Sequence, residues 1–587
     1  MPLTTRRGFR ALASGLLAAG LAVAVAAPAL ATARPDFPSS GTRPASTTVV
    51  TPGTGPLSVA VLVPIVAPPT TSGLIPAEDL ERYTGQFGTL TRQLDAISGS
   101  AVTLAIDPMV LASIRVLGRS APESALAWLT RLEALPNEAF TLAYGDADLV
   151  TAARTDTLAA LQPSGFGFAL DPADFSPVEP EPTETPTPAP TETPDPDAAP
   201  PFPTTDELLG WVSTLPSIAW PADETLGAQD LAPVAAAGYE DVVVSSELVG
   251  SSTPLVALEG VQGIVSDAAL SASFREAFAA ISEADRAAAL AALDEGLAAE
   301  VASSPGRGVV LTLDRGWANS MSGAVETLTH LQTVASAQSV TLGEILDTTA
   351  TSASLADAAA DEDREQVFTS LADDAAAELT FSSVVVDPAP LLDTRGLARI
   401  ALYANGWRPD ETGWNEAVDA FHTDSEAILS SVRIERGSDV VLLARNTDFR
   451  VAVSNELPYA ISVLVGVRPQ SPILRVEGDV ELTVEPQSTG SARVPVEAVA
   501  NGDVIVQTTL HSPTGVPIDS AFVRVTAQAE WEGIGTTVFV AILLIVFGAG
   551  IVRLILRRRR ARASAAVDGE SDDADADAGA VTEEPRG

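Results

Sequence analysis

Residues 139–150 read AFTLAYGDADLV. An uncharged apolar run stops at Tyr144, two carboxylates follow at Asp146 and Asp148, and apolar residues then resume. The pattern is typical of a buried strand that ends in a turn and leads into a helix. Three roles are open to the carboxylates: an acid and base pair, a metal site, or the N-cap of the next helix.

The same alternation recurs on both sides of this stretch. Apolar, β-branched runs begin at Leu57, Ala101, Ala139, Gly165, Ser217, Asp241, Val261 and Gly308, and Ala- and Leu-rich helical patterns separate them. Strands that are apolar throughout and alternate with helices indicate a parallel sheet covered by helices. Roughly seven or eight such units predict an α/β domain, a distorted β/α barrel, over residues 57–400.

The remaining composition divides the chain further. Residues 176–203 are rich in Pro, Thr and Glu and cannot pack a core. We expect them to form an insertion in the barrel, because neither side carries enough strands alone. Residues 401–430 are predicted to be a helical connector. Short alternating strands separated by turn residues predict an immunoglobulin-like β-sandwich, an all-β domain, over residues 431–530.

The N-terminus indicates export. Arg6, Arg7 and Arg10 precede a long apolar run that ends in small residues, so residues 1–33 are predicted to be a signal peptide. A membrane anchor is the alternative, and the adjacent arginines leave Sec and twin-arginine export both open. Residues 34–56 are expected to be a flexible lead.

The C-terminus predicts a membrane helix over residues 534–556. This stretch is long and apolar enough to cross a bilayer, and an arginine cluster follows it at residues 557–562. The positive-inside rule places that cluster in the cytoplasm. We therefore expect a single-pass protein of the cell membrane with its N-terminal ectodomain outside. Its tail, residues 557–587, is basic and then acidic and is predicted to be disordered.

Charge and residue counts exclude several functions. The chain has 34 basic and 77 acidic residues, a net charge of −43, which disfavours binding to nucleic acid. It has no cysteine, so disulfides and thiolate sites are excluded. Its three histidines lack metal-ligand spacing, and neither a phosphate-binding glycine loop nor a GxSxG elbow is present. No metal and no cofactor are expected.

Acidic and aromatic residues follow the predicted strands. In a β/α barrel the chemistry lies at the carboxyl ends of the strands. The candidate catalytic residues there are Asp146, Asp148, Asp223 and Asp314, and the candidate ligand-binding residues are Tyr144, Trp220, Asp267 and Trp317. Paired carboxylates divide acid and base roles in glycosidases, and aromatic faces stack on sugar rings.

Helix capping competes with this interpretation. Asp107 and Asp171 each precede a proline, which is the expected arrangement of an N-cap, and we predict that both are caps. Asp146 and Asp148 remain open, since one helix needs only one cap. Arg315 follows Asp314 directly and is an alternative partner that would neutralise it in a salt bridge.

Four motifs carry a resemblance to a known family. They are LAYGDADL (142–149), SIAWPADE (217–224), VVVSS (242–246) and IVSDAALS (264–271). Together with the predicted sandwich and terminal helix, they resemble the actinobacterial DUF6049 family of envelope proteins, which has no established activity. The barrel is also distantly similar to the glycoside hydrolase/polysaccharide deacetylase superfamily. Deacetylases of that superfamily use a His-x-x-x-His metal site, which this sequence lacks.

The sequence thus predicts a membrane-anchored cell-envelope protein outside the cytoplasm. Its carbohydrate-active-like barrel is expected to recognise, rather than hydrolyse, an envelope glycan or lipid-linked precursor. Any enzymatic activity would be of the glycoside hydrolase type and not that of a His-zinc deacetylase. The alternative is a non-enzymatic scaffold or regulatory partner of the membrane machinery that builds the cell wall.

Overall fold

The computed structural model describes residues 55–176, 202–319, 321–528 and 532–564. The predicted signal peptide, nearly all of the predicted flexible lead and of the Pro/Thr-rich insertion, and most of the predicted tail lie outside the described residues.

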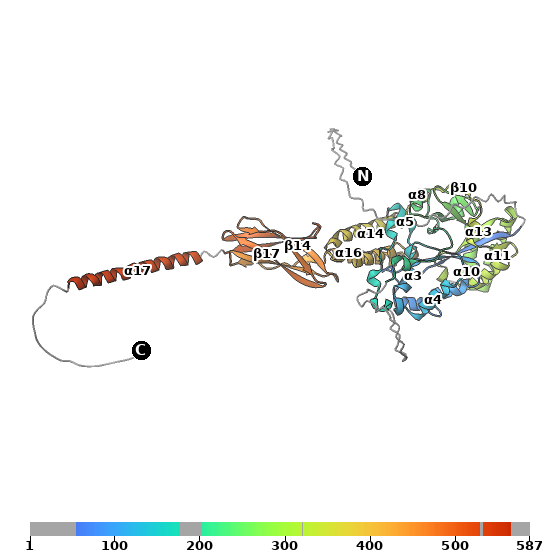
Figure 1. The fold of residues 1–587 in the computed structure, drawn as a ribbon. Coiled ribbons are helices and arrows are strands. Elements are labelled where there is room, and N and C mark those ends of the chain that lie inside the picture. Colours follow the sequence, from blue (N-terminus) through green and yellow to red (C-terminus); the bar gives the residue numbers. More distant parts are fainter. Residues whose placement is uncertain (1–54, 177–201, 320, 529–531, 565–587) are drawn as a thin grey trace, which may run out of the picture. The chain divides into compact units, whose positions relative to one another are not determined.

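Ten strands form one sheet in the first part of the chain (Figure 1). They are β1 (Leu57–Ile65), β2 (Val102–Ile106), β3 (Ala139–Thr141), β4 (Ile218–Ala219), β5 (Asp241–Ser245), β6 (Leu255–Ala257), β7 (Gln262–Ser266), β8 (Gly308–Thr312), β9 (Ala337–Ser339) and β10 (Thr351–Ser352). The main order is β10-β6-β7-β8-β1-β2-β3; β5 also pairs with β7, β4 with β5, and β9 with β1. All of these pairs are parallel except β6 with β7.

Strand β1 lies in the middle of this sheet. Val61 pairs with Val102 of β2, and Ser58 pairs with Gly308 of β8. Nearly every residue of β1 is buried, because other parts of the protein cover both faces of the strand. This explains its continuous apolar sequence. Strands from before and after residues 177–201 therefore belong to one sheet.

The sheet curls around a core of its own. Side chains from seven strands that run parallel to one another share this core, among them Leu62, Ala105, Phe140, Ile218, Val243, Ile264 and Val310. Strands β3 and β4 are far apart in the strand order, yet the rings of Phe140 and Trp220 lie 6.4 Å apart. The Ser213 hydroxyl also donates a 2.9 Å hydrogen bond to the Ala139 carbonyl. The two ends of the sheet therefore approach each other.

The prediction of an α/β fold with a parallel sheet is confirmed, and the sheet is curled as a distorted barrel requires. Within the described residues no strand ladder joins β3 to β4, so the ring is not closed by strand pairing. Side-chain packing and the bonds to Ala139 take the place of that ladder. The antiparallel strand β6 is a second departure from simple β/α repetition.

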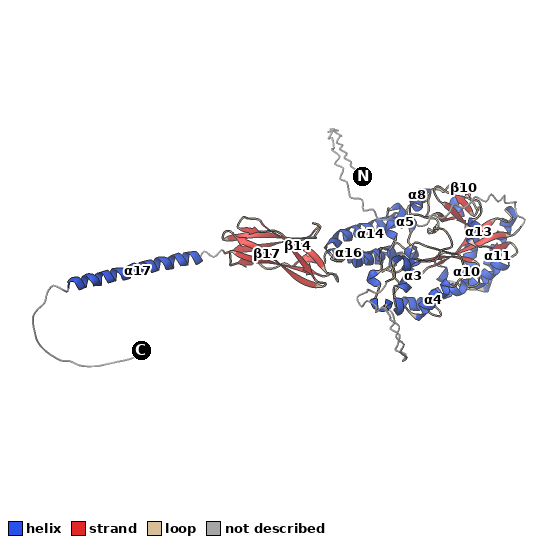
Figure 2. Ribbon diagram, in the orientation of Figure 1, coloured by secondary structure: helices blue, strands red, loops and turns tan. Residues whose placement is uncertain are grey.

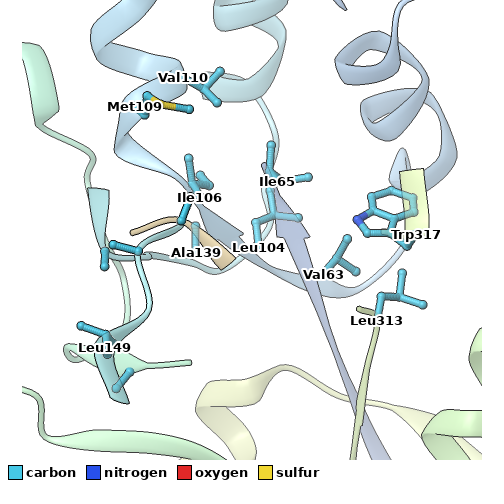
Figure 3. Close-up of a cluster of buried hydrophobic side chains, with 14 of the residues drawn as sticks. Val63, Ile65, Leu104, Ile106, Met109, Val110, Ala139, Leu149, Leu313 and Trp317 are labelled. Carbon is cyan, nitrogen blue, oxygen red and sulfur yellow. The ribbon is translucent and has the colours of Figure 1, made fainter. Parts of the chain in front are cut away.

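Helices cover the outside of the curl, as Figure 2 shows. They are α1 (Ala77–Thr84), α2 (Thr89–Ile97), α3 (Pro108–Arg115), α4 (Glu123–Glu133), α5 (Leu149–Arg154), α6 (Pro172–Phe175), α7 (Thr205–Leu209), α8 (Leu231–Ala236), α9 (Ser246–Val249), α10 (Ala268–Ala279), α11 (Glu283–Ser303), α12 (Ala324–Thr333) and α13 (Leu342–Leu346). A second, larger hydrophobic core lies between these helices and the strands. Figure 3 shows part of it, where Val63, Ile65 and Ile106 meet Met109 and Trp317.

Three further helices follow the sheet: α14 (Glu362–Phe381), α15 (Ala389–Leu402) and α16 (Glu411–Leu429). A buried ion pair of 2.8 Å joins Arg395 to Glu378, and the Arg395 guanidinium lies 3.6 Å from the centre of the Phe421 ring. Phe368 stacks on Tyr403 at 4.0 Å. These contacts hold the three helices together.

Residues 432–527 form two sheets that are antiparallel except for the pair β12–β19. One has the order β11-β13-β17-β15 and the other β12-β19-β18-β14-β16. The strands are β11 (Val432–Ile434), β12 (Val440–Leu442), β13 (Asn446–Asn455), β14 (Ile461–Pro469), β15 (Leu474–Val476), β16 (Val480–Val484), β17 (Ser488–Ala498), β18 (Gly502–His511) and β19 (Pro517–Ala527). One hydrophobic cluster contains side chains of both sheets, and Phe381, Val384, Val385 and Leu391 from the end of α14 to α15 also belong to it.

Helix α17 (Glu532–Ser564) is the last described element. Within its segment Thr537–Arg559, the most apolar stretch of 18 residues has a mean hydropathy of 2.8, and the rest of the protein buries none of that stretch. By length and composition it can cross a membrane. This agrees with the predicted terminal membrane helix.

Candidate functional site

The turn after β3 has an unusual backbone. Gly145 and Asp146 have φ angles of 65° and 48°, in the left-handed region that non-glycine residues rarely adopt. Two contacts hold the turn in this conformation. The Gly145 amide donates to Asp107 Oδ1 at 2.8 Å, and the Asn405 side chain donates to the Asp146 carbonyl at 2.9 Å. Strained backbone of this kind concentrates at functional sites.

Asp146 forms a two-bonded ion pair with Arg315, which follows β8. The guanidinium Nε lies 3.1 Å from Asp146 Oδ2, and one terminal nitrogen lies 3.1 Å from Oδ1. The same guanidinium donates to the carbonyls of Trp220 and Pro221 and lies 4.9 Å from the centre of the Trp220 ring. Burial raises the pKa of Asp146, and Arg315 opposes that shift.

The suggested salt bridge between Arg315 and Asp314 is wrong. Arg315 is partly buried and pairs with Asp146, while Asp314 is exposed. Neighbouring residues just beyond a strand point in different directions, so their proximity along the chain does not make them partners.

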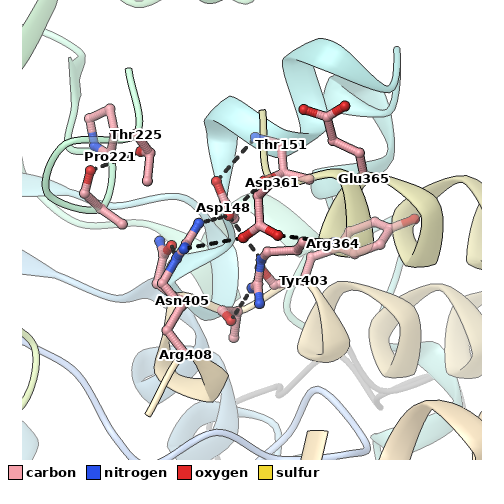
Figure 4. A network of polar contacts seen from close by, with 12 residues as sticks. Asp148, Thr151, Pro221, Thr225, Asp361, Arg364, Glu365, Tyr403, Asn405 and Arg408 are labelled. Atoms are coloured by element: carbon pink, nitrogen blue, oxygen red, sulfur yellow. Dashed lines mark hydrogen bonds and ion pairs between the residues drawn. The ribbon is translucent and has the colours of Figure 1, made fainter. Parts of the chain in front are cut away.

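Asp148 is fully buried and is surrounded by arginines (Figure 4). Its Oδ2 accepts from Arg364 at 3.0 Å and from Arg408 at 2.6 Å, and its Oδ1 accepts from the Thr151 amide at 3.1 Å. The last bond makes Asp148 the N-cap of α5. Burial alone would raise the pKa of Asp148, but the two guanidinium groups outweigh it and the pKa is lowered.

Asp107 is a third buried carboxyl beside this turn. Its Oδ1 accepts from both the Met109 amide, at 2.9 Å, and the Gly145 amide. The first bond confirms the predicted N-cap of α3, and Asp171 caps α6 in the same way. Burial raises the pKa of Asp107 to about 8, because the buried carboxylate loses its hydration, and the nearby negative charge of Asp146 adds to the shift.

A first cleft of about 200 Å³ opens beside the Asp146–Arg315 pair. Its lining comes from residues that follow β1, β2, β3 and β8, and from the segment after α15: it includes Pro68, Thr70, Thr89, Met109, Asp146, Arg315, Asn405 and Gly406. Asp148 and Asp107 are not part of this lining. We call this cavity cleft A.

A second cleft, of about 240 Å³, lies beyond the ends of β4, β5, β7 and β8 and is named cleft B. Its lining combines apolar residues with polar ones, and the polar ones are Asp223, Glu224, Ser245, Glu247, Ser266, Ser271, Arg275 and Thr312. Buried hydroxyls of Ser266 and Thr312 lie 2.8 Å apart, and Arg275 donates to the Thr312 hydroxyl at 2.9 Å. Glu224, at the edge of cleft B, has a φ of 63°.

Both clefts lie at the carboxyl ends of the strands, the edge at which the candidate residues were expected. Trp220 lines cleft B, and its carbonyl and that of Pro221 accept from Arg315, which lines cleft A. Arg315 therefore connects the walls of the two clefts.

The side chains of Tyr144, Trp220 and Trp317, which were predicted as aromatic platforms, are buried in the hydrophobic cores, and Trp220 also lines cleft B. The Tyr144 hydroxyl donates to the Gly73 carbonyl at 2.6 Å, and the Trp317 ring nitrogen donates to the Pro64 carbonyl at 2.8 Å. Arg315 lies against the Trp220 ring.

The remaining candidates have ordinary partners. Asp267 caps α10 by accepting from the Leu270 amide at 3.1 Å. Asp223 lines cleft B and pairs with Arg275 at 2.9 Å, with more than half of its side chain exposed. Among the described residues, no group of three or more His, Asp and Glu side chains is arranged to hold a metal ion.

Sequence reasoning missed a Ser-His-Asp row between α14 and α16. His422 lies 2.6 Å from Asp374 through Nδ1 and 3.3 Å from Ser370 through Nε2. Ser370 lies inside α14, where the backbone amides are used by the helix, and its hydroxyl also donates to the Val367 carbonyl at 2.9 Å. Such a serine has no oxyanion-stabilising amides, so the row joins two helices rather than forming a hydrolytic site.

The fold and its clefts define a class: a mixed α/β protein whose described residues contain a curled parallel sheet, two further β-sheets and one helix able to span a membrane. Residues 17–576 match the model of a family described as a family of unknown function, DUF6049, and the chain belongs to that family. The resemblance drawn from the four sequence motifs is thus confirmed at the level of the family.

Solved structures show weak likeness only. The α-amylase AmyC of Thermotoga maritima has 11% identity and a TM-score of 0.34, covering 64% of this chain and 97% of its own. An α-2-macroglobulin fragment of Escherichia coli has 14% identity and a TM-score of 0.14, covering 17% of each chain. A FixG-related protein of Vibrio parahaemolyticus has 14% identity and a TM-score of 0.12, covering 17% of this chain and 94% of its own. No curated protein matches the chain.

Proposed function

We propose that this chain is an exported, membrane-anchored envelope protein whose curled-sheet domain binds a hydroxyl-rich ligand, an envelope glycan or its lipid-linked precursor, without cleaving it. Helix α17 is the anchor, and the two β-sheets are an immunoglobulin-like module between anchor and binding domain. Clefts A and B are the binding sites.

One observation supports binding over hydrolysis: the two carboxylates of the 144–148 turn, Asp146 and Asp148, are already paired with arginines. A glycosidase needs one protonated carboxyl and one carboxylate that both face the scissile bond. Here Asp146 gives both oxygens to Arg315, and Asp148 is fully buried against Arg364 and Arg408. Their pKa values are shifted in opposite directions, as in an acid and base pair, but a substrate in cleft A reaches only Asp146.

The polar groups that remain suit hydroxyl groups. In cleft A, Asn405 and the Asp146–Arg315 pair supply donors and acceptors among mostly apolar neighbours. In cleft B, hydroxyls and carboxylates alternate around Arg275. Sugar hydroxyls both donate and accept, so they can bond to each of these groups. Few polar groups within a concave, partly apolar surface are typical of binding sites.

Blocking each cleft tests the proposal. We expect Thr89→Trp, which fills cleft A, and Ala272→Trp, which fills cleft B, each to weaken binding at least about tenfold, a loss of about 1.4 kcal/mol. Binding of soluble bacterial cell-wall fragments to the full chain in detergent, by calorimetry, is the measurement. Arg92→Trp is the matched control, because Arg92 is exposed on α2, the helix of Thr89.

The same samples distinguish binding from catalysis. Mass spectrometry of the fragments after long incubation should show no product for any variant. Product formation by any of the four proteins would contradict the proposal, and so would fragments that bind all four proteins equally.

A second candidate is a non-enzymatic partner of membrane machinery that builds the envelope. The small size of the clefts favours it, since each is below the roughly 300–1,000 Å³ usual for ligand sites. On that account Thr89→Trp and Ala272→Trp leave cellular function intact, while replacing Thr537–Arg559 by an unrelated apolar helix abolishes it.

A further inference from the structure

The all-β part has two ends, and the chain leaves toward α17 from only one of them. At that end β19 finishes at Ala527, which pairs with Gly502 at the start of β18 and with Leu442 at the finish of β12. We call this the exit end; it comprises residues 441–446, 469–473, 499–505 and 527–528.

Exposed apolar side chains gather at the exit end. Within residues 432–528 the large apolar side chains exposed to solvent are Val441, Leu443, Val499, Ile505 and Phe522. The first four belong to the exit end, with Leu443 64% exposed and Val499 50% exposed. The opposite end, where β13 finishes and β17 begins, carries none in this range. Single exposed apolar residues are ordinary, but a group of them at one end of a domain marks an interaction surface.

The length of the connection points to the partner. Only residues 528–536 separate β19 from Thr537, where the apolar segment of α17 begins. Nine residues span at most roughly 35 Å even when fully extended. If α17 crosses the membrane, as the proposed function requires, the exit end cannot be far from the lipid surface.

Charged groups at the same end suit a lipid surface as well. The Arg445 and Arg475 side chains are 71% exposed, and both pair with Glu497 at 3.3 Å. Exposed ion pairs of this kind are weak, so both guanidinium groups are able to exchange Glu497 for lipid phosphates. Apolar tips flanked by arginines are the usual composition of an interfacial contact.

We propose that the exit end rests on the outer surface of the membrane in which α17 is anchored. Leu443 and Val499 then insert at the boundary between the lipid headgroups and the acyl chains. Val441 and Ile505 lie behind them on the outer face of the same sheet. This contact fixes the tilt of the all-β part on its short tether. The proposal rests on the proposed function, because it takes α17 as a membrane anchor.

The absence of cysteine from the sequence allows a direct test. Leu443→Cys and Val499→Cys, each carrying an environment-sensitive nitrobenzoxadiazole label, are reconstituted as full chains in phosphatidylcholine vesicles. We expect blue-shifted emission that is quenched by lipids with bromines about 5–10 Å deep, the depth that interfacial side chains reach. Thr489→Cys is the control, since Thr489 is exposed at the opposite end of the same part.

Extraction with alkaline carbonate separates the two proposals. A chain that carbonate removes from the vesicles is not anchored, which overturns the proposed function and this inference with it. A chain that stays in the vesicles while the label at 443 matches the label at 489, in emission and in quenching, overturns this inference alone. Because the labelled positions are exposed, the label need not disturb folding, and tryptophan emission checks that it does not.

Discussion

Arg364→Met should lower the free energy of unfolding by about 3–5 kcal/mol, the cost of removing one partner from a buried ion pair. Asp148 is fully buried, and after this change it keeps only Arg408 as a charged partner. Arg364 also donates to the Ala404 carbonyl at 2.8 Å and lies 4.8 Å from the centre of the Trp414 ring. The substitution therefore also weakens the contact between α14 and the segment after α15.

Urea unfolding of the full chain in detergent, followed by tryptophan fluorescence, measures this effect. Six of the seven tryptophans lie between residues 128 and 414, so the signal reports on the curled sheet and its helices. Arg82→Met is the control, because Arg82 is 65% exposed in its pair with Asp79, and such pairs contribute less than about 1 kcal/mol. Equal losses of unfolding free energy in Arg364→Met and Arg82→Met would show that Asp148 is not held in a buried ion pair with Arg364.

Asp107→Asn should stabilise the protein above pH 8. The carboxyl uses a single oxygen, Oδ1, to accept from both Met109 and Gly145, and the one carbonyl oxygen of asparagine can accept the same two bonds. The amide carries no charge, whereas burial raises the pKa of Asp107 to about 8 and makes its ionised form costly. The substitution thus removes the free-energy cost of a buried negative charge and keeps the N-cap of α3.

The sign of the pH dependence follows from proton binding. Between the ordinary pKa of an aspartate, about 4, and the folded value of about 8, the folded chain holds a proton that the unfolded chain has lost. Wild-type stability relative to Asp107→Asn should therefore fall as pH rises through this range, by up to about 1.4 kcal/mol per pH unit, and level off above it.

Urea midpoints of both proteins from pH 5 to about 9 provide the comparison. Asp171→Asn is the control, since Asp171 makes the same cap in the exposed α6 and its variant should follow wild type. Parallel curves for wild type and Asp107→Asn would mean that Asp107 is not buried as the structure has it.

Local patterns were sufficient for seven of the eight predicted strands and for several caps; the run that begins at Gly165 forms a 3-10 helix over Gly167–Ala169 instead of a strand. The run LSVAVLVPI predicted a strand buried on both faces, and β1 is one, because covering both faces removes the alternation of polar residues. Asp107 and Asp171 were predicted as caps from the proline that follows each. Capping depends on residues within one helical turn, so it can be read from a short window.

The ion-pair partners of Asp146 and Asp148 could not be predicted from short stretches of sequence. Arg364 and Arg408 lie 216 and 260 residues from Asp148, and nothing near either arginine in the sequence indicates that contact. Arg315 has an acid as its neighbour, yet it pairs with Asp146, 169 residues away. The burial of the aromatic candidates could not be predicted for a related reason, since a tryptophan after a strand is equally compatible with a core and with a binding surface.

The central claim is that the carboxylates of the 144–148 turn are built into the fold instead of facing a substrate as a pair. Carbodiimide coupling of glycine ethyl ester, mapped by mass spectrometry on the full chain in detergent, measures the accessibility of each carboxyl. The account predicts fast modification of the exposed Asp223 and Asp314 and very slow modification of Asp146 and Asp148. Modification of Asp146 and Asp148 as fast as that of Asp223 would contradict it.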